Sequence, residues 1–144
     1  MTKKKIRQWL IEHPRLNPYK FSINILFRYL TLPLRVNPDF IIIGFHKSGT
    51  TSLYNYLIQH PNIESASEKE LEFFSYAYDR GMSYYKLQFP TKIKKWLIER
   101  KTKNKFLTGE ASPAYSYHPY APERIKKNLP NVKLIGVLRN PIDR

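Results

Sequence analysis

The hydrophobic pattern of residues 39–144 alternates between strand-like and helix-like segments. Residues 40–43 form a continuous apolar run that is rich in β-branched residues and too short for a helix, and residues 132–138 have the same character. Such runs are typical of strands buried on both faces of a parallel sheet. Residues 105–113 predict a third, short strand that leads into a turn.

Three helices are expected between these strands. Residues 51–59 predict the first, which stops before Pro61. Residues 91–103 predict a basic helix, and a last helix opens at Pro122 and ends near Asn128. The side chains expected to pack the basic helix against the fold are Ile93, Trp96 and Leu97. Strands that alternate with helices indicate an α/β fold, here a P-loop-like parallel sheet flanked by helices.

The first 38 residues have a different character. Prolines interrupt them repeatedly, which predicts short helical pieces in a basic N-terminal extension of a domain at residues 39–144. These pieces are expected to lie against the domain or on an anionic membrane surface. No apolar run reaches the ~18–20 residues of a membrane span, and Glu12, His13 and Pro14 interrupt what would be the apolar part of a signal peptide. We therefore expect a soluble, cytoplasmic protein, with peripheral membrane contact through the basic N-terminus as an option.

Charge adds a preference for anionic partners. The 144 residues carry a formal charge of +14, which is concentrated in two segments. Residues 1–38 contain eight Lys or Arg against Glu12, and residues 91–105 contain seven against Glu99. These segments are solvated helix faces or surfaces for an anionic partner, and no specific nucleic-acid partner is expected because the pattern of such a module is not evident. The chain has no cysteine and no metal-ligand spacing of histidines and acids, so we expect no metal site.

The segment from Gly44 to Ser52 predicts a phosphate-binding loop between the first strand and the first helix. Gly44 permits a sharp turn, and Gly49 permits close approach of the backbone to an anion. The amides from about Ser48 to Ser52 would open the helix, where free N–H groups and the helix dipole favour phosphate. The hydroxyl donors available there belong to Thr50, Thr51 and Ser52.

The lysine of this loop is displaced from the ATP-type pattern. That pattern, G-x-x-x-x-G-K-[ST], requires lysine at position 50, where this chain has threonine. Lys47 instead lies inside the loop, where it could neutralise charge beyond a single bound phosphate. The loop therefore predicts a nucleotide whose one 5′-phosphate carries a transferable group, and it disfavours a nucleotide kinase.

Two motifs give the chain a family resemblance. The sequence HKSGTT, residues 46–51, resembles the 5′-phosphosulfate loop of sulfotransferases that use 3′-phosphoadenylyl sulfate (PAPS), and VLRNPIDR, residues 137–144, resembles the start of their 3′-phosphate loop. The resemblance covers residues 39–144 and implies PAPS as co-substrate, with no metal. It implies that Lys47 relieves charge on the leaving phosphate and that Arg139 binds the ribose 3′-phosphate. The residues it implies for the 5′-phosphosulfate are Lys47, Ser48, Gly49, Thr50, Thr51 and Ser52.

The segment between the two motifs resembles the carbohydrate-acting branch of this family. In EKELEFF, residues 68–74, Glu70 takes the position of the catalytic base, which implies a saccharide hydroxyl or amine as acceptor. Phe73 and Phe74 are expected in the core. The alternative for Glu70 is a solvated acidic face, whose members would be Glu64, Glu68, Glu70 and Glu72.

Two other positions bear on the choice of branch. Several relatives carry a lysine in the turn that corresponds to GEASPAY, residues 109–115, where this chain has Ala111; Lys69 or the basic helix would have to replace it. The small-molecule branch uses a histidine in a setting that His118 does not match. His118 is therefore expected to be an ordinary surface or packing histidine.

Two functional hypotheses follow. The chain is a PAPS-dependent sulfotransferase, or it is a truncated, inactive module that binds a nucleotide or a polyanion. Because little chain follows residues 132–138 to cover that strand, residues 39–144 are expected to be the N-terminal part of a sulfotransferase domain, incomplete at the C-terminus and inactive alone. If so, the purified chain should aggregate or unfold without cooperativity.

Overall fold

The computed structural model describes residues 28–140, and the chain divides into two compact units, Met1–Pro33 and Leu34–Arg144. A single 3-10 turn, η2 (Leu32–Leu34), lies at the boundary in the sequence. The helical pieces and the membrane contact predicted for the N-terminus fall on residues 1–27, outside the described residues. The end of the VLRNPIDR motif, residues 141–144, lies outside them as well.

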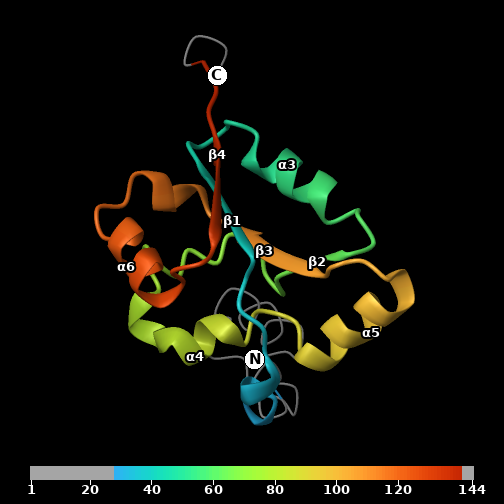
Figure 1. Ribbon diagram of the computed structural model, residues 1–144. Helices are drawn as coiled ribbons and strands as arrows, with labels where there is room; N and C mark the ends of the chain where they lie inside the picture. Colours follow the sequence, from blue (N-terminus) through green and yellow to red (C-terminus); the bar gives the residue numbers. More distant parts are fainter. Residues whose placement is uncertain (1–27, 141–144) are drawn as a thin grey trace, which may run out of the picture. The chain divides into compact units, whose positions relative to one another are not determined.

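Four parallel strands form the sheet of the second unit, in the spatial order β2-β3-β1-β4 (Figure 1). The strands are β1 (Phe40–Gly44), β2 (Ile63–Ser65), β3 (Leu107–Ala111) and β4 (Lys133–Val137). β1 pairs with both β3 and β4, with Ile41 beside Glu110 and Gly44 beside Val137. The α/β fold with a parallel sheet, predicted from the alternating segments, is confirmed.

The second unit contains the helices α3 (Thr50–Leu57), α4 (Gly81–Lys86), α5 (Lys92–Thr102) and α6 (Ala121–Asn128), with 3-10 turns η3 (Tyr78–Arg80) and η4 (Pro113–Ser116). Three of the helices, α3, α5 and α6, lie close to the predicted segments, and α4 was not predicted. α5 begins after Thr91, whose hydroxyl accepts a hydrogen bond from the amide of Lys94. α6 has Pro122 in its first turn, where a missing N–H costs no helical hydrogen bond. None of the helices in the described residues is long and apolar enough to cross a membrane.

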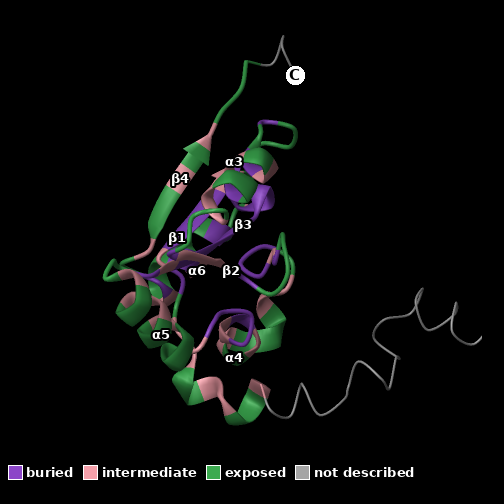
Figure 2. Ribbon diagram, turned by 90° about the vertical axis from the view of Figure 1, so that its right-hand side faces the viewer, coloured by how far each residue is buried: buried purple, intermediate pink, exposed green. Residues whose placement is uncertain are grey.

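The sheet is buried between two apolar clusters because successive residues of β1 point to opposite faces. Phe40 and Ile42 pack with Tyr54 of α3 on one face. On the other face Ile41 belongs to an aromatic cluster, whose largest members are Phe73, Phe74, Tyr85 and Tyr115. Figure 2 shows β1 largely purple inside the fold and β4 largely green at the edge of the sheet. The core position predicted for the two phenylalanines is confirmed.

α5 corrects one packing prediction. Its predicted packing residues are exposed instead, at 57%, 54% and 53% of their surface: Ile93, Trp96 and Leu97. The helix is attached to the sheet by polar contacts, an ion pair of 2.7 Å between Lys94 and Glu64 of β2 and a hydrogen bond of 2.6 Å between Asn62 and Thr102. The apolar stripe was correctly located on the helix, but the prediction that it packs against the fold was wrong.

Candidate active site

Gly44 ends β1 at a point where the backbone of β4 comes very close. A Cβ atom at this position would lie 2.5 Å from the carbonyl oxygen of Val137 and 3.0 Å from the hydroxyl of Ser48. The sequence suggested that Gly44 permits a sharp turn. The structure gives it a different task, because the absence of a side chain lets the loop and β4 pack against the end of β1.

The loop between β1 and α3 closes on itself through Ser48. Both the amide and the hydroxyl of Ser48 donate to the carbonyl oxygen of Phe45, at 3.1 Å and 2.7 Å. Lys47 and Gly49 have positive φ angles of 61° and 101°. At Gly49 this left-handed conformation is free of strain because glycine lacks a Cβ atom. The loop therefore turns back on itself within a few residues and leads directly into α3.

The N-terminus of α3 leaves backbone donors available for an anion. Its first helical hydrogen bond runs from the amide of Leu53 to the carbonyl of Gly49, at 3.0 Å, and no side chain in the described residues caps the helix. The amides of the first turn lack helical acceptors for geometric reasons. They point outward with the positive end of the helix dipole, an arrangement that suits phosphate. The predicted phosphate-site residues in this turn are Thr50, Thr51 and Ser52.

Two lysines accompany this turn. Lys47 is exposed, and its ammonium group forms no ion pair with a side chain in residues 28–140. Lys69 donates a hydrogen bond of 2.8 Å to the hydroxyl of Thr51 and forms an ion pair of 3.4 Å with Glu70. A single side chain thus connects the first turn of α3 to the carboxylate predicted to act as base.

Glu70 lies in a loop with unusual backbone geometry. Its φ angle is 56° and that of Glu72 is 45°, values that residues other than glycine rarely adopt. Leu71 between them is buried, whereas the Glu70 side chain is 42% exposed. Leu71 thus anchors the loop in the core, while the side chain of Glu70 next to it faces solvent beside Lys69. A carboxylate in such a position is accessible to an acceptor.

The structure adds a residue that sequence analysis missed, Glu110 at the end of β3. It is buried, with 1% of its surface exposed, and accepts hydrogen bonds from three hydroxyl groups. The donors are Tyr85 at 2.6 Å, Ser112 at 2.8 Å and Tyr115 at 3.2 Å. Burial raises the pKa of Glu110 from 4.5 to about 7, although the three hydrogen bonds act in the opposite direction. The one sign in the sequence that Glu110 is buried was its position between a glycine and an alanine in a predicted strand.

Arg139 lies at the same edge of the sheet as the phosphate loop. Because β1 and β4 are parallel and Gly44 pairs with Val137, the chain leaves both strands at the same end of the sheet. The loop begins one residue beyond Gly44, and Arg139 follows two residues beyond Val137, where it is exposed. The phosphate loop and the described part of the second motif, residues 137–140, therefore leave the sheet at the same edge although they are distant in sequence.

Three further predictions concern residues outside the phosphate loop and the Glu70 segment. Ala111, in place of the family lysine, is buried against the cluster of Phe40, Ile42 and Tyr54. His118 packs edge-on against Tyr76 with ring centroids 5.4 Å apart, in agreement with a packing histidine. The four acids do not act as one surface, because Glu64 pairs with α5 whereas Glu70 pairs with Lys69.

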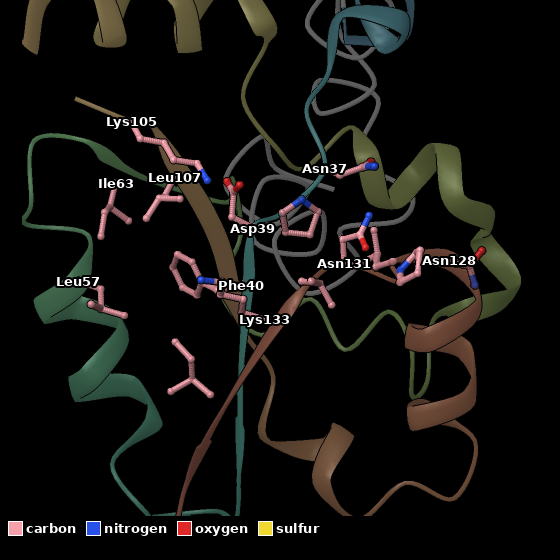
Figure 3. A pocket seen from close by; sticks show the side chains of 15 residues that line it. Asn37, Asp39, Phe40, Leu57, Ile63, Lys105, Leu107, Asn128, Asn131 and Lys133 are labelled. Carbon is pink, nitrogen blue, oxygen red and sulfur yellow. The ribbon is translucent and has the colours of Figure 1, made fainter. Parts of the chain in front are cut away.

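A cavity of about 460 Å³ lies at the opposite end of the sheet (Figure 3). Phe40 and Lys133, the first residues of β1 and β4, line it together with Leu107, the first residue of β3. The phosphate loop and Arg139 follow the last residues of these strands. The cavity is thus separate from the candidate site, at the amino ends of the strands rather than at their carboxyl ends.

Comparison with known proteins gives a consistent result. The sequence profile of the sulfotransferase domain matches residues 37–144. The chain is 40% identical over 109 residues to the membrane-associated sulfotransferase kil1 of Dictyostelium discoideum, a match that covers 74% of this chain and 21% of that protein. It is 35% identical over 107 residues to the mouse heparan sulfate glucosamine 3-O-sulfotransferase 6, a match that covers 74% of this chain and 28% of the relative.

A solved structure is also similar. The crystal structure of a sulfotransferase from Alicyclobacillus acidocaldarius superposes with a TM-score of 0.53 and 32% sequence identity, over 75% of this chain and 47% of that one. The chain thus spans about a fifth to a quarter of the length of the two curated relatives above. The loop at the carboxyl end of β1, the second motif beyond β4 and the profile match over residues 37–144 agree, and the chain belongs to the sulfotransferase domain family.

Proposed function

We propose that this chain carries the donor-binding part of a sulfotransferase active site, which moves a sulfuryl group from PAPS to a hydroxyl or amine of a saccharide. The observation that carries the proposal is the uncapped first turn of α3, with the exposed Lys47 beside it and with Thr51 and Ser52 at least partly exposed; the side chain of Thr50 is buried. The saccharide acceptor is supported by the names of two relatives, the 3-O-sulfotransferase and a human bifunctional heparan sulfate N-deacetylase/N-sulfotransferase 3 that is 35% identical over 113 residues.

The residues present fit a PAPS molecule at both of its charged ends. The amides of the first turn and the hydroxyls of Thr51 and Ser52 offer several donors to a 5′-phosphosulfate, whereas the side chain of Thr50 is buried. Lys47 supplies the positive charge that stabilises the departing phosphate oxygen. Arg139 offers a guanidinium group to the 3′-phosphate, for which its planar donors are well suited.

The role proposed for Glu70 is that of general base. The acceptor oxygen or nitrogen forms a bond to sulfur while the bond between sulfur and the phosphate oxygen breaks, which releases adenosine 3′,5′-bisphosphate. Glu70 takes the proton that the acceptor loses. Lys69 holds the carboxylate through the ion pair of 3.4 Å and ties it to Thr51. In-line placement of acceptor and leaving group would follow from this connection.

Binding of adenosine 3′,5′-bisphosphate tests the donor site. In a calorimetric titration the chain should bind this nucleotide much more tightly than AMP, because only the former carries the 3′-phosphate. Lys47→Ala should weaken binding about tenfold or more, whereas Lys126→Ala, which removes an equal charge from the surface of α6, should not. Equal affinity for the two nucleotides would instead favour the alternative, a module that binds polyanions without enzymatic activity.

The base is tested by a second substitution. Glu70→Gln keeps the size of the side chain and removes its ability to take a proton at neutral pH. Binding of adenosine 3′,5′-bisphosphate should remain as in the wild type. In a preparation whose wild type transfers sulfuryl groups from PAPS to a heparan-type oligosaccharide, Glu70→Gln should abolish this transfer. Transfer that persists in Glu70→Gln would remove Glu70 from this role.

A further inference from the structure

Glu110 is the one fully buried carboxylate among residues 28–140, and the reaction proposed above does not use it. It cannot touch a substrate, because 1% of its surface is exposed. Above about pH 7, where Glu110 is ionised, its carboxylate accepts hydrogen bonds and donates none. The three hydroxyl groups that contact Glu110 therefore all direct their hydrogens towards it, which leaves their oxygen lone pairs free to accept from other groups.

Two of those hydroxyls accept hydrogen bonds from backbone amides of the loop that carries Glu70. The oxygen of Ser112 accepts from the amide of Glu72 at 3.1 Å. The oxygen of Tyr115 accepts from the amide of Phe74 at 3.3 Å. Each forms a chain of two hydrogen bonds, from amide to hydroxyl and from hydroxyl to carboxylate, in which each bond polarises the next.

The segment held in this way needs support. Positive φ angles at Glu70 and Glu72 cost of the order of 1 kcal/mol each and persist only where surrounding contacts maintain them. Leu71, Phe73 and Phe74 anchor the same segment in the core through their side chains. Apolar packing holds the loop against the core. The two hydrogen bonds donated by its amides fix the orientation of its backbone.

We infer that Glu110 is a positioning residue: it orients the hydroxyls of Ser112 and Tyr115 so that they hold residues 70–74 in the conformation that places Glu70 beside Lys69 and the phosphate loop. The inference rests on the proposed role of Glu70 as base. Its structural part, the control of the loop backbone by a buried carboxylate, can be tested without any measurement of transfer.

Replacement by glutamine separates this role from mere filling of space. Glu110→Gln has nearly the same volume, but one of its two terminal groups is an NH₂ that donates. At least one hydroxyl must then accept a hydrogen bond from residue 110. This new donor competes with the loop amide for the oxygen of that hydroxyl. Ser112→Ala breaks one of the two connections directly. Tyr85→Phe removes a hydroxyl that contacts Glu110 but no loop amide, and it serves as the matched control.

The experiment is amide hydrogen exchange, measured by NMR on the whole chain for Glu72 and Phe74 relative to the amides of β1. Glu110→Gln should accelerate exchange about tenfold relative to β1 at the loop amide whose hydroxyl meets the new NH₂ group, as expected for loss of one hydrogen bond. That amide is Phe74 if the NH₂ replaces Oε1, which Tyr115 contacts at 3.2 Å, and Glu72 if it replaces Oε2, which Ser112 contacts. Ser112→Ala should accelerate exchange at Glu72, and Tyr85→Phe at neither amide. The Overhauser contact between Lys69 and the methyl group of Thr51 should weaken in the first two variants only.

Equal acceleration at the loop and at β1, or unchanged exchange at the loop in Glu110→Gln, would overturn the inference. If Glu110→Gln does not fold, Glu110→Asp decides the matter by the same criterion, since it keeps the charge and withdraws the carboxylate from the two hydroxyls by one methylene group. Failure of the donor site is recognised separately, because it would appear in the titration of adenosine 3′,5′-bisphosphate and not in the exchange rates.

Discussion

Among single residues, Glu110 gives the clearest expected dependence on pH. Burial raises its pKa from 4.5 to about 7, so the folded protein holds this proton more tightly than the unfolded chain does. Stability from this residue is complete below pH 4.5 and is lost as the pH rises to about 7, by about 3 kcal/mol. Urea unfolding at about pH 5 and pH 7.5 should show this loss in the wild type and a flatter profile in Glu110→Gln. Parallel profiles would mean that Glu110 titrates normally.

Gly44 provides a second prediction at this scale. A methyl group at this position would lie 2.5 Å from a backbone oxygen of β4, so Gly44→Ala should force the two strands apart and reduce the free energy of unfolding by about 1–3 kcal/mol. Gly136 is the matched control because it belongs to β4, and a methyl group added there would have no atom within 4 Å. Gly136→Ala should change stability by no more than about 0.5 kcal/mol. Urea midpoints that fall equally in both variants would contradict the close contact at Gly44.

Individual residues differ in how far the sequence reveals them. The phosphate-loop residues stand together in one short motif and Glu70 stands in another, so both could be selected as candidates from the sequence alone. Glu110 could not be recognised, because its hydrogen-bond donor Tyr85 comes from α4, a separate element 25 residues away in the sequence. Lys69 was available only as a substitute for a missing lysine, since its contact with Thr51 depends on a loop whose φ angles no pattern encodes.

At the level of elements, the strands and helices with a strong local sequence pattern were predictable, and short elements without such a pattern were not. β1 is recognisable because it is a continuous apolar run, whereas β2 is a three-residue strand with the sequence IES and no apolar pattern. The stripe on α5 illustrates a different limit. Periodicity identifies one side of a helix, but only the tertiary contacts decide whether that side meets the sheet or the solvent.

The outward stripe of α5 leads to a prediction about stability. Because Ile93 and Leu97 are more than half exposed, Ile93→Gln and Leu97→Gln should each change the free energy of unfolding by no more than about 0.5 kcal/mol. Ile42→Ala in β1, where the side chain is fully buried, should cost about 2–5 kcal/mol and serves as the contrast. If a glutamine on α5 costs as much as the alanine in β1, another part of the chain covers the stripe.

At the level of the whole molecule, the family assignment depends on topology as much as on motifs. HKSGTT and the described part of VLRNPIDR lie far apart in the sequence, and neither is distinctive alone. They leave the sheet at one edge because β1 and β4 are adjacent, parallel and in register from Phe40 beside Lys133 to Gly44 beside Val137. A parallel sheet brings the carboxyl ends of its strands to one edge, and ligands of open α/β sheets bind there.

The distribution of charge over the molecule yields the last prediction. Lys94 of α5 pairs with Glu64 of β2, and no hydrogen bond or ion pair within residues 28–140 joins α5 to the phosphate loop, so binding of a polyanion and binding of the donor should be separable. Replacing Lys92, Lys101 and Lys103 by alanine should weaken binding of a heparin-type polyanion and reduce its salt dependence, with the affinity for adenosine 3′,5′-bisphosphate unchanged. Lys47→Ala should have the reverse effect. Calorimetric titrations at about 50 and 200 mM salt measure both; loss of both ligands in the α5 variant would place the nucleotide on the basic helix and would favour the polyanion-binding alternative over the enzyme.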